Sequence, residues 1–102
     1  MKKDLIDLKN KVCLVTGCNG YVGNEITNKL ANLGVKIIGT DLNFKKNKNL
    51  RMYLQANLED KDDINRITGK INSKFKKIDI LINNASYVGT SEISKKNYKK
   101  VF

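Results

Sequence analysis

The sequence of 102 residues contains no histidine, no proline and no tryptophan. Without histidine, the chain itself supplies no Ser-His-Asp or Cys-His catalytic arrangement, no histidine metal ligand and no histidine pH switch. No apolar run approaches the roughly 18 residues that span a bilayer, which predicts that there is no transmembrane segment. The charged amino terminus leads into no apolar stretch, so we expect no secretory signal.

Cysteine is scarce: the sequence contains two, Cys13 and Cys18. Two thiols alone build neither a four-thiolate zinc site nor a disulfide framework, and we expect no metal site. If residues 12–16 form a strand, the two thiols lie farther apart than the ~7 Å between Cα atoms that a disulfide allows. We therefore interpret both as free thiols in a reducing, cytoplasmic compartment.

Positive charge is abundant: 20 Lys and Arg stand against 10 Asp and Glu, for a formal net charge of +10. This excess raises the hypothesis of a nucleic-acid or anionic-membrane partner. However, Arg51 and Arg66 are the only arginines, and the lysines are scattered over every segment. No segment interleaves arginine with aromatic residues that could stack on bases. A codon bias toward A and T explains the lysines better, so nucleic-acid binding stays a weaker alternative and we expect no membrane partner.

Two kinds of apolar pattern alternate along the chain. Continuous apolar runs are typical of parallel strands buried on both faces, and helical spacing of apolar residues follows each of several runs. The predicted strands lie near residues 11–16, 35–41, 51–57 and 78–83, and the predicted helices near 21–33, 59–72 and 94–102. This order predicts an α/β fold in a single partial domain, 1–102. It corresponds to half of a doubly wound, Rossmann-type parallel sheet with strand order 3-2-1-4.

The predicted helices carry apolar stripes that we expect to face the sheet. In the first helix the stripe is formed by Val22, Ile26, Leu30 and Leu33. In the second it is formed by Ile64, Ile67, Ile71 and Phe75. Gly34 stands where a left-handed residue ends the first helix. The fourth predicted strand is expected to present an apolar edge at Ile78, Ile80 and Ile82, which invites aggregation or pairing.

A glycine-rich turn, Thr16-Gly17-Cys18-Asn19-Gly20-Tyr21-Val22-Gly23, joins the first predicted strand to the first predicted helix. Gly17 permits the tight turn, Gly20 lets the backbone approach a pyrophosphate, and Gly23 lets the helix pack against the strand. The start of the helix offers free N–H donors and the positive end of its dipole to phosphates. The turn predicts a dinucleotide-binding site, with a purely structural turn as the alternative.

Asp41 ends the second predicted strand, 18 residues after Gly23. A carboxylate at this place accepts hydrogen bonds from both ribose hydroxyls of an adenosine and repels a 2′-phosphate. Asp41 therefore predicts NAD in preference to NADP. Lys45 and Lys46 lie close enough in sequence to soften that preference.

The glycine turn, Asp41 and the segment Asp79-Ile-Leu-Ile-Asn-Asn-Ala-Ser86 together make the chain resemble the short-chain dehydrogenase/reductase family. This segment is similar to the family's Asn-Asn-Ala-Gly element, which closes the fourth strand beside the cofactor. The resemblance implies that Asn57, followed by Leu58, contacts the adenine ring and that Asn83 and Ala85 lie along the ribose and its phosphate. The expected cofactor-binding set is Thr16, Gly17, Asn19, Gly20, Tyr21, Val22, Gly23, Asp41, Asn57, Leu58, Asn83 and Ala85.

The sequence departs from the family pattern in three minor ways. The spacing Gly-x-x-Gly-x-x-Gly is more usual in extended and atypical members, whereas Asn-Asn-Ala is typical of compact ones. Ser86 replaces a glycine, a change that we expect to be tolerated. The loop 42–50 is too short for the helix that usually joins the second and third strands.

A larger departure concerns catalysis. The resemblance implies an NAD(P)-dependent oxidoreductase that moves hydride between the nicotinamide and a small alcohol/carbonyl substrate, and whose full-length form is a homo-oligomer. The family's Tyr-x-x-x-Lys pair is absent from these residues, so we expect no catalytic residue here. We predict that the chain is the truncated, cofactor-binding amino-terminal part of such an oxidoreductase and that it is inactive alone. The alternative is a non-catalytic module that binds NAD or another adenine nucleotide. Residues 88–91 resemble members from bacterial surface-sugar pathways, which points to a sugar-related substrate.

Overall fold

The computed structural model describes residues 7–85. Its elements, in chain order, are β1 (Val12–Thr16), α1 (Tyr21–Asn32), β2 (Lys36–Asp41), β3 (Met52–Gln55), α2 (Lys61–Phe75) and β4 (Ile80–Ile82). Strands β3 and β4 are shorter than the sequence predicts. Helix α2 continues through Gly69 and ends at Phe75, beyond its predicted end near residue 72. The Phe75 side chain packs against the core, which stabilises this last turn. The helix predicted at 94–102 lies outside the described residues.

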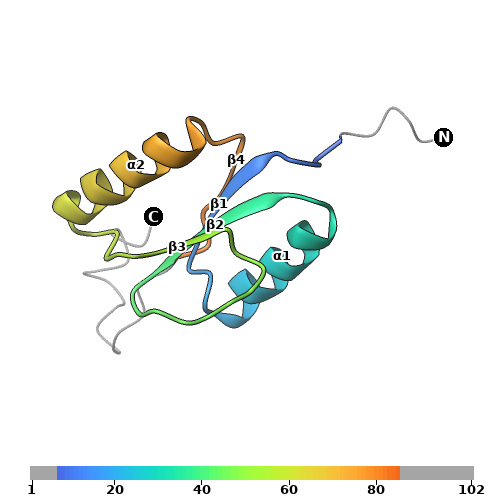
Figure 1. Cartoon of the computed structure of the whole chain (residues 1–102). Helices are drawn as coiled ribbons and strands as arrows, with labels where there is room; N and C mark the ends of the chain where they lie inside the picture. The colour runs from blue at the N-terminus through green and yellow to red at the C-terminus, as the bar shows by residue number, and fades with distance from the viewer. Residues whose placement is uncertain (1–6, 86–102) are drawn as a thin grey trace.

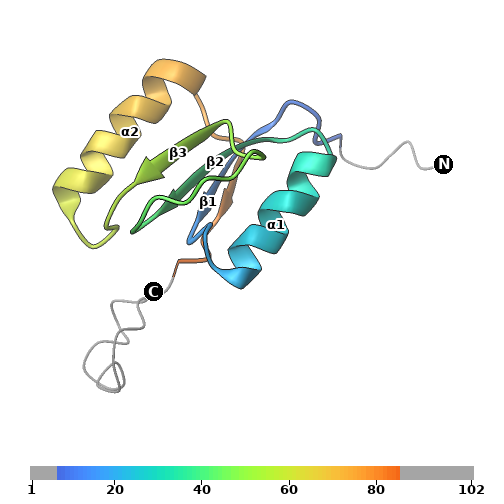
Figure 2. The same ribbon diagram turned by 60° about the horizontal axis from the view of Figure 1, so that its bottom comes forward.

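The four strands form one parallel sheet in the order β3-β2-β1-β4. The chain moves from β1 to β2 and β3 in one direction and then returns past β1 to β4. Crossovers of the same hand therefore place α1 and α2 on opposite faces of the sheet, as Figures 1 and 2 show. The strand order and the parallel pairing confirm the predicted fold class.

The core consists of two apolar layers, one on each face of the sheet. Successive residues of a strand point to opposite faces, so each buried strand contributes to both layers. The layer under α1 contains Cys13, Val15, Cys18, Val35 and Ile37, and the layer under α2 contains Val12, Ile38, Leu54, Ala56, Ile67 and Ile71. Both cysteines are free and buried.

Small residues, and not the predicted apolar stripe, form the buried side of α1. Gly23 and Thr27 are its buried residues, whereas Val22 and Leu33 are 55% and 57% exposed. Of the predicted stripe, Leu30 packs against the core layer under α1. The prediction was wrong because it counted only large apolar residues, while this helix approaches the sheet through residues with little or no side chain.

The end of α1 agrees with the sequence-based expectation. Gly34 has φ +85°, its N–H donates to the carbonyl of Ala31, and the N–H of Val35 donates to that of Leu30. This pair of bonds satisfies carbonyls that the helix end leaves free. The chain is thereby turned directly into β2.

Of the predicted apolar edge at Ile78, Ile80 and Ile82, Ile78 alone is exposed. Ile80 and Ile82 are partly buried against the layer under α1, whereas Leu81 is 60% exposed and Ile78 is 39% exposed. Beside Ile78, a hollow of about 260 Å³ is lined mainly by apolar side chains, most of them from α2, with Leu14 of β1. Neither helix among residues 7–85 is long and apolar enough to cross a membrane.

Candidate functional site

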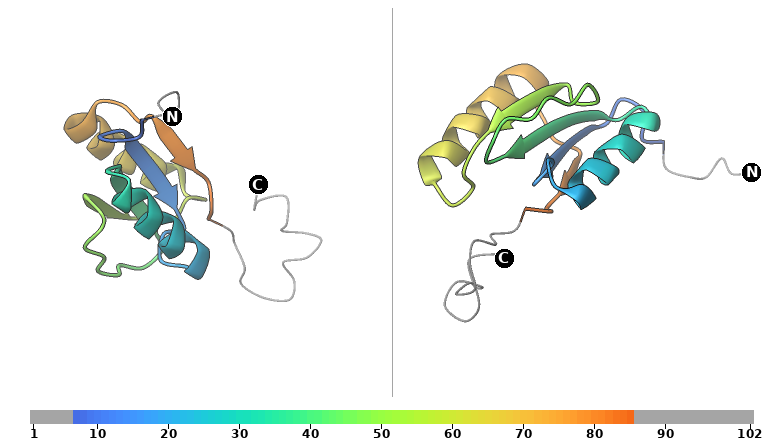
Figure 3. Two further views of the ribbon diagram at one scale, coloured as in Figure 1. Left: turned by 90° about the vertical axis from the view of Figure 1, so that its right-hand side faces the viewer. Right: turned by 90° about the horizontal axis from the view of Figure 1, so that it is seen from below.

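The carboxyl ends of the parallel strands meet along one edge of the sheet, and most predicted site residues lie there. The loop 17–20, called the phosphate loop below, leaves the end of β1 beside the end of β4 (Figure 3). The N–H groups of Gly17 and Cys18 donate to the carbonyl of Thr40 at 2.9 and 3.3 Å, which ties this loop to β2. Ligands bind at this edge in open α/β sheets.

The amino terminus of α1 is open. Gly20 is its N-cap and provides no side-chain hydrogen bond, and its first turn contains no acidic residue. Among residues 7–85, no acceptor is found for the N–H groups of Tyr21, Val22 and Gly23. Three free donors at the positive end of a helix dipole form a place where an anion is stabilised.

The three glycines of the turn meet different surroundings. A Cβ on Gly17, where φ is +66°, would lie 2.9 Å from the Cα of Ala85. On Gly23 it would lie 2.2 Å from the carbonyl oxygen of Gly17 and 2.9 Å from the Asn84 amide nitrogen. On Gly20 the nearest atom would be 3.7 Å away. Protein packing thus requires Gly17 and Gly23, whereas the backbone at Gly20 stays uncovered, as a ligand-facing position requires.

The Thr16 side chain is turned into the protein. It is 6% exposed, and its hydroxyl oxygen accepts from the N–H groups of Asn84 at 2.9 Å and Ala85 at 2.8 Å. The hydroxyl in turn donates to the Asn83 side-chain oxygen at 3.3 Å, and the Asn84 amide donates to the carbonyl of Gly17 at 3.2 Å. Thr16 therefore holds the turn after β4 against the phosphate loop. Asn84 was missing from the expected set, although the Asn-Asn doublet signalled it.

Asp41 lies directly beside the phosphate loop. One carboxylate oxygen accepts the backbone N–H of Asn19 and the other that of Leu42, both at 2.8 Å. Each carboxylate oxygen has the capacity for more than one hydrogen bond, so the carboxylate can still accept from a ribose diol. Burial, followed by the negative charge of Asp41, raises the pKa of Cys18 to about 11, so this thiol is neutral and unreactive at physiological pH.

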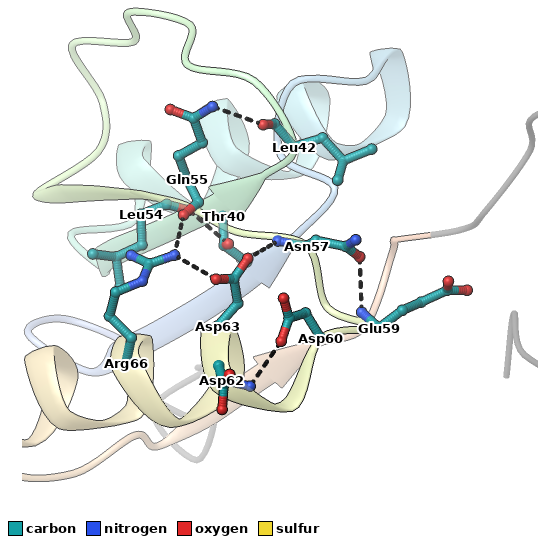
Figure 4. Close-up of polar contacts among 10 residues, drawn as sticks. All are labelled: Thr40, Leu42, Leu54, Gln55, Asn57, Glu59, Asp60, Asp62, Asp63 and Arg66. Carbon is teal, nitrogen blue, oxygen red and sulfur yellow. Dashed lines mark hydrogen bonds and ion pairs between the residues drawn. The ribbon is translucent and has the colours of Figure 1, made fainter.

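Asn57 is fixed by the first turn of α2 (Figure 4). Its backbone N–H donates to Asp63 at 2.8 Å, and its side-chain oxygen accepts the N–H of Glu59 at 2.9 Å. The bond from Asn57 and the ion pair with Arg66 hold the pKa of Asp63 below its usual range. The Leu58 side chain packs in the layer under α2, and its expected contact with the adenine stays a prediction.

The comparisons with known proteins identify the family of the chain. The model of the short chain dehydrogenase family matches residues 11–102. A 3-oxoacyl-(acyl-carrier-protein) reductase of Buchnera aphidicola is 39% identical over 85 residues, which are 76% of this chain and 35% of that protein. The chain therefore belongs to the short-chain dehydrogenase family, whose members are oxidoreductases.

Solved structures show the same fold. NAD⁺-bound xylitol dehydrogenase superposes with a TM-score of 0.71 at 26% identity, over 83% of this chain and 36% of that one. A 3-ketoacyl-(acyl-carrier-protein) reductase from Brucella melitensis, complexed with NADH, has a TM-score of 0.70 at 23% identity, over 92% of this chain and 43% of that one. The chain spans about a third of the length of the curated reductase that it matches.

Proposed function

We propose that this chain is the NAD-binding amino-terminal part of a short-chain oxidoreductase, whose complete form transfers hydride between NAD(P) and a small alcohol/carbonyl substrate. One observation carries the proposal: the uncapped start of α1, with three free N–H donors, adjoins the uncovered backbone of Gly20. This arrangement suits a pyrophosphate. The xylitol dehydrogenase that shares the fold was solved with NAD⁺ bound.

The residues present fit a dinucleotide. Tyr21, Val22 and Gly23 would donate their N–H groups to the pyrophosphate, and the Asp41 carboxylate would accept from the adenosine ribose. Asn57 would face the adenine, and Asn83 with Ala85 would border the ribose and its phosphate. The nicotinamide supplies hydride chemistry when bound, and the chain's own part is to bind and orient the adenosine and pyrophosphate end.

NAD is the cofactor that the site favours over NADP. The carboxylate of Asp41 is held by the N–H groups of Asn19 and Leu42, so it remains at the edge of the site when no nucleotide is bound. A 2′-phosphate would meet this negative charge at close range, which is unfavourable. The two free cysteines support a reducing compartment for the protein.

We do not assign a catalytic residue to this chain. No tyrosine in the sequence is followed four residues later by a lysine, so the chain by itself is proposed to hold cofactor without transferring hydride. The same observation favours a second candidate, a module that binds NAD or another adenine nucleotide without chemistry. The substrate of a complete form, sugar-related or not, and its assembly as a homo-oligomer are further parts of the proposal.

Calorimetric titration of the chain with NAD, NADP and ADP-ribose tests the proposal. We expect binding of one NAD per chain, weaker binding of NADP, and an affinity loss of about tenfold in Asp41→Ala, because a charge-assisted hydrogen bond contributes about 1.5–3 kcal/mol. Asp62→Ala removes the same charge from the exposed surface of α2 and is the matched control. Absence of NAD binding by the wild-type chain would refute both candidates, and oxidation of an alcohol by this chain would refute its inactivity.

A further inference from the structure

The two edges of the sheet are protected to different degrees. At the β3 edge, the Arg66 guanidinium of α2 donates to the carbonyl oxygen of Gln55 at 2.8 Å. The Gln55 side chain also donates to the carbonyl oxygen of Leu42 at 3.0 Å, so side chains occupy part of this edge. At the other edge, within residues 7–85, β4 pairs with β1 alone (Figure 3). An edge strand with unpaired N–H and C=O groups is a template for another strand.

The hydrogen bonds of β1 show which backbone groups of β4 face the open side. The Val12 carbonyl oxygen accepts the N–H of Asp79 at 2.8 Å, so the even-numbered residues of β1 face β4. Leu14, one of these, lies opposite Leu81. In a parallel pair, a residue that faces its neighbour bonds to the two residues that flank the opposite one. The backbone groups of Leu81 therefore point away from β1, and the N–H of Asn83 has no acceptor among residues 7–85.

The side chain at the centre of β4 is uncovered as well. Residues opposite each other in a parallel pair point to the same face, so Leu81 shares the α2 face of the sheet with Leu14. Leu14 packs against the layer under α2, whereas Leu81 is 60% exposed. Ile80 and Ile82 point to the other face and pack against the layer under α1. Strand β4 thus combines an open backbone with an exposed apolar side chain.

The residues of this edge are complementary to themselves. The sequence reads the same in both directions around Leu81, because Ile80 precedes it and Ile82 follows it. About a two-fold axis at Leu81, the outward N–H and C=O groups of this residue meet those of Leu81 in a second, antiparallel copy. The N–H of Asn83 then faces the Asp79 carbonyl of the second copy. Each Ile80 lies opposite an Ile82, and no like charges oppose each other.

Other two-fold registers fit less well. A shift of one residue brings the groups that already bond to β1 to the interface, so only shifts of two residues keep outward groups opposite each other. A shift of two residues places the Leu81 side chain opposite Asp79 or opposite Asn83. The pair of leucines is then replaced by a leucine beside a polar side chain, which is a less favourable cross-strand pair.

We propose that the open edge of β4 is the interface at which two copies of this chain associate, antiparallel and in the register centred on Leu81. The two four-stranded sheets then join into one continuous sheet. The paired segment is short, so the dimer is weak, with a dissociation constant roughly in the micromolar range. The inference does not rest on nucleotide binding, because the interface runs along the side of β4 and the phosphate loop lies beyond the strand ends.

Leu81→Lys tests the interface with little disturbance of the fold, because this side chain is exposed. It removes the leucine pair and sets two positive charges opposite each other. Leu33→Lys is the matched control: Leu33, at the end of α1, is 57% exposed and gains the same charge. Sedimentation equilibrium of the 102-residue chain should show a monomer–dimer equilibrium for the wild type and Leu33→Lys. We expect Leu81→Lys to raise the dissociation constant at least about a hundredfold.

A disulfide cross-link tests the register. Leu81→Cys places two thiols at opposite positions of a hydrogen-bonded antiparallel pair, whose Cα atoms lie about 5.5 Å apart, within the range of a disulfide. With oxidised glutathione as the oxidant, we expect this variant to form a covalent dimer. Gln55→Cys places a thiol on the β3 edge and should stay uncross-linked. The wild-type chain controls for Cys13 and Cys18, which are buried.

Each outcome decides for or against the interface. A wild-type dimer that Leu81→Lys abolishes and Leu33→Lys keeps supports it, as does a cross-link specific to Leu81→Cys. A wild-type chain that stays monomeric up to about 1 mM overturns it. If the Leu81 amide of that monomer exchanges slowly with solvent, residues 86–102 of the same chain cover the edge instead. A dimer that survives Leu81→Lys, or that Gln55→Cys cross-links equally well, places the interface elsewhere and also overturns the inference.

Discussion

Helices α1 and α2 begin in opposite electrostatic surroundings. At α2, the Asp60 side chain accepts the N–H of Asp62 at 2.9 Å, and Asp62 and Asp63 place two carboxylates in the first turn. At α1, Gly20 supplies no side chain and the first turn has no acidic residue. Both helices carry the same kind of dipole, but the protein stabilises only one amino terminus with its own carboxylates. The other amino terminus remains available to an external anion.

Substitution of one glycine in each helix tests the difference between α1 and α2 with the largest expected effect. Gly23→Ala places a Cβ 2.2 Å from the carbonyl oxygen of Gly17, so we expect the free energy of unfolding to fall by about 3 kcal/mol and NAD binding to be lost. A Cβ at Gly69 in α2 would have no atom within 4 Å, so Gly69→Ala is expected to raise the free energy of unfolding by about 0.5–1 kcal/mol. Urea unfolding followed by circular dichroism measures both, and equal effects would contradict the account.

Giving α1 the kind of cap that α2 has should stabilise the fold and abolish the site. Gly20 has φ −72° and ψ 170°, which any residue adopts, and the space over it is open. We expect Gly20→Asp to raise stability by a few tenths of a kcal/mol and to weaken NAD binding at least about tenfold by repulsion of the phosphates. Gly20→Asn, a neutral cap of the same shape, is the control. Equal affinities of the two variants would show that charge is not the cause.

Removal of the cap from α2 should have the converse effect. Asp60→Ala leaves the Asp62 N–H without its acceptor, and we expect a loss of about 1 kcal/mol of stability. NAD affinity should not change, because the Asp60 side chain holds the Asp62 N–H, whereas Asn57 is held by Asp63 and by the N–H of Glu59. A calorimetric titration beside a thermal melt checks both values, and a coupled loss of affinity would mean that the two helix starts are not independent.

Acid should destabilise the protein through carboxylates that the fold has made more acidic. The Val12 N–H and Lys77 lower the pKa of Asp79, as the Asn57 N–H and Arg66 lower that of Asp63. A lowered folded-state pKa means that the contribution is complete above the unfolded value near 4 and is lost as the pH falls through the folded value. We expect Asp79→Asn to flatten the decline of melting temperature below about pH 4.

The sequence predicts the sheet better than it predicts how α1 packs. Unbroken apolar runs such as that at Val12–Val15 identify buried parallel strands, and the order of elements then leaves few topologies. The packing of α1 was missed because Gly23 and Thr27 carry no large apolar signal. Close approach of two backbones is a property of the folded pair, and helical periodicity does not report it.

The candidate site was predictable in its local parts only. The spacing of the glycines and of Asp41 in the sequence predicts this part of the site. The structure brings Asn19 and Asp41 together. Asn43 and Tyr53 gave no signal, because Asn43 takes part through its backbone carbonyl and Tyr53 belongs to β3, outside the quoted motifs. The hydrogen bonds of Asn19 to the Asn43 carbonyl and the Tyr53 hydroxyl depend on the register of β3 beside β2, which the sequence pattern does not specify.

One measurement tests the central claim, that the open start of α1 receives the cofactor. The ¹⁵N-labelled chain is titrated with NAD while amide chemical shifts are followed by NMR. The account predicts that the amides of Tyr21, Val22 and Gly23 shift together and saturably, and by more than those of residues 61–63 at the start of α2. Equal or larger shifts at the start of α2, or none at the start of α1 in a millimolar excess of NAD, would contradict it.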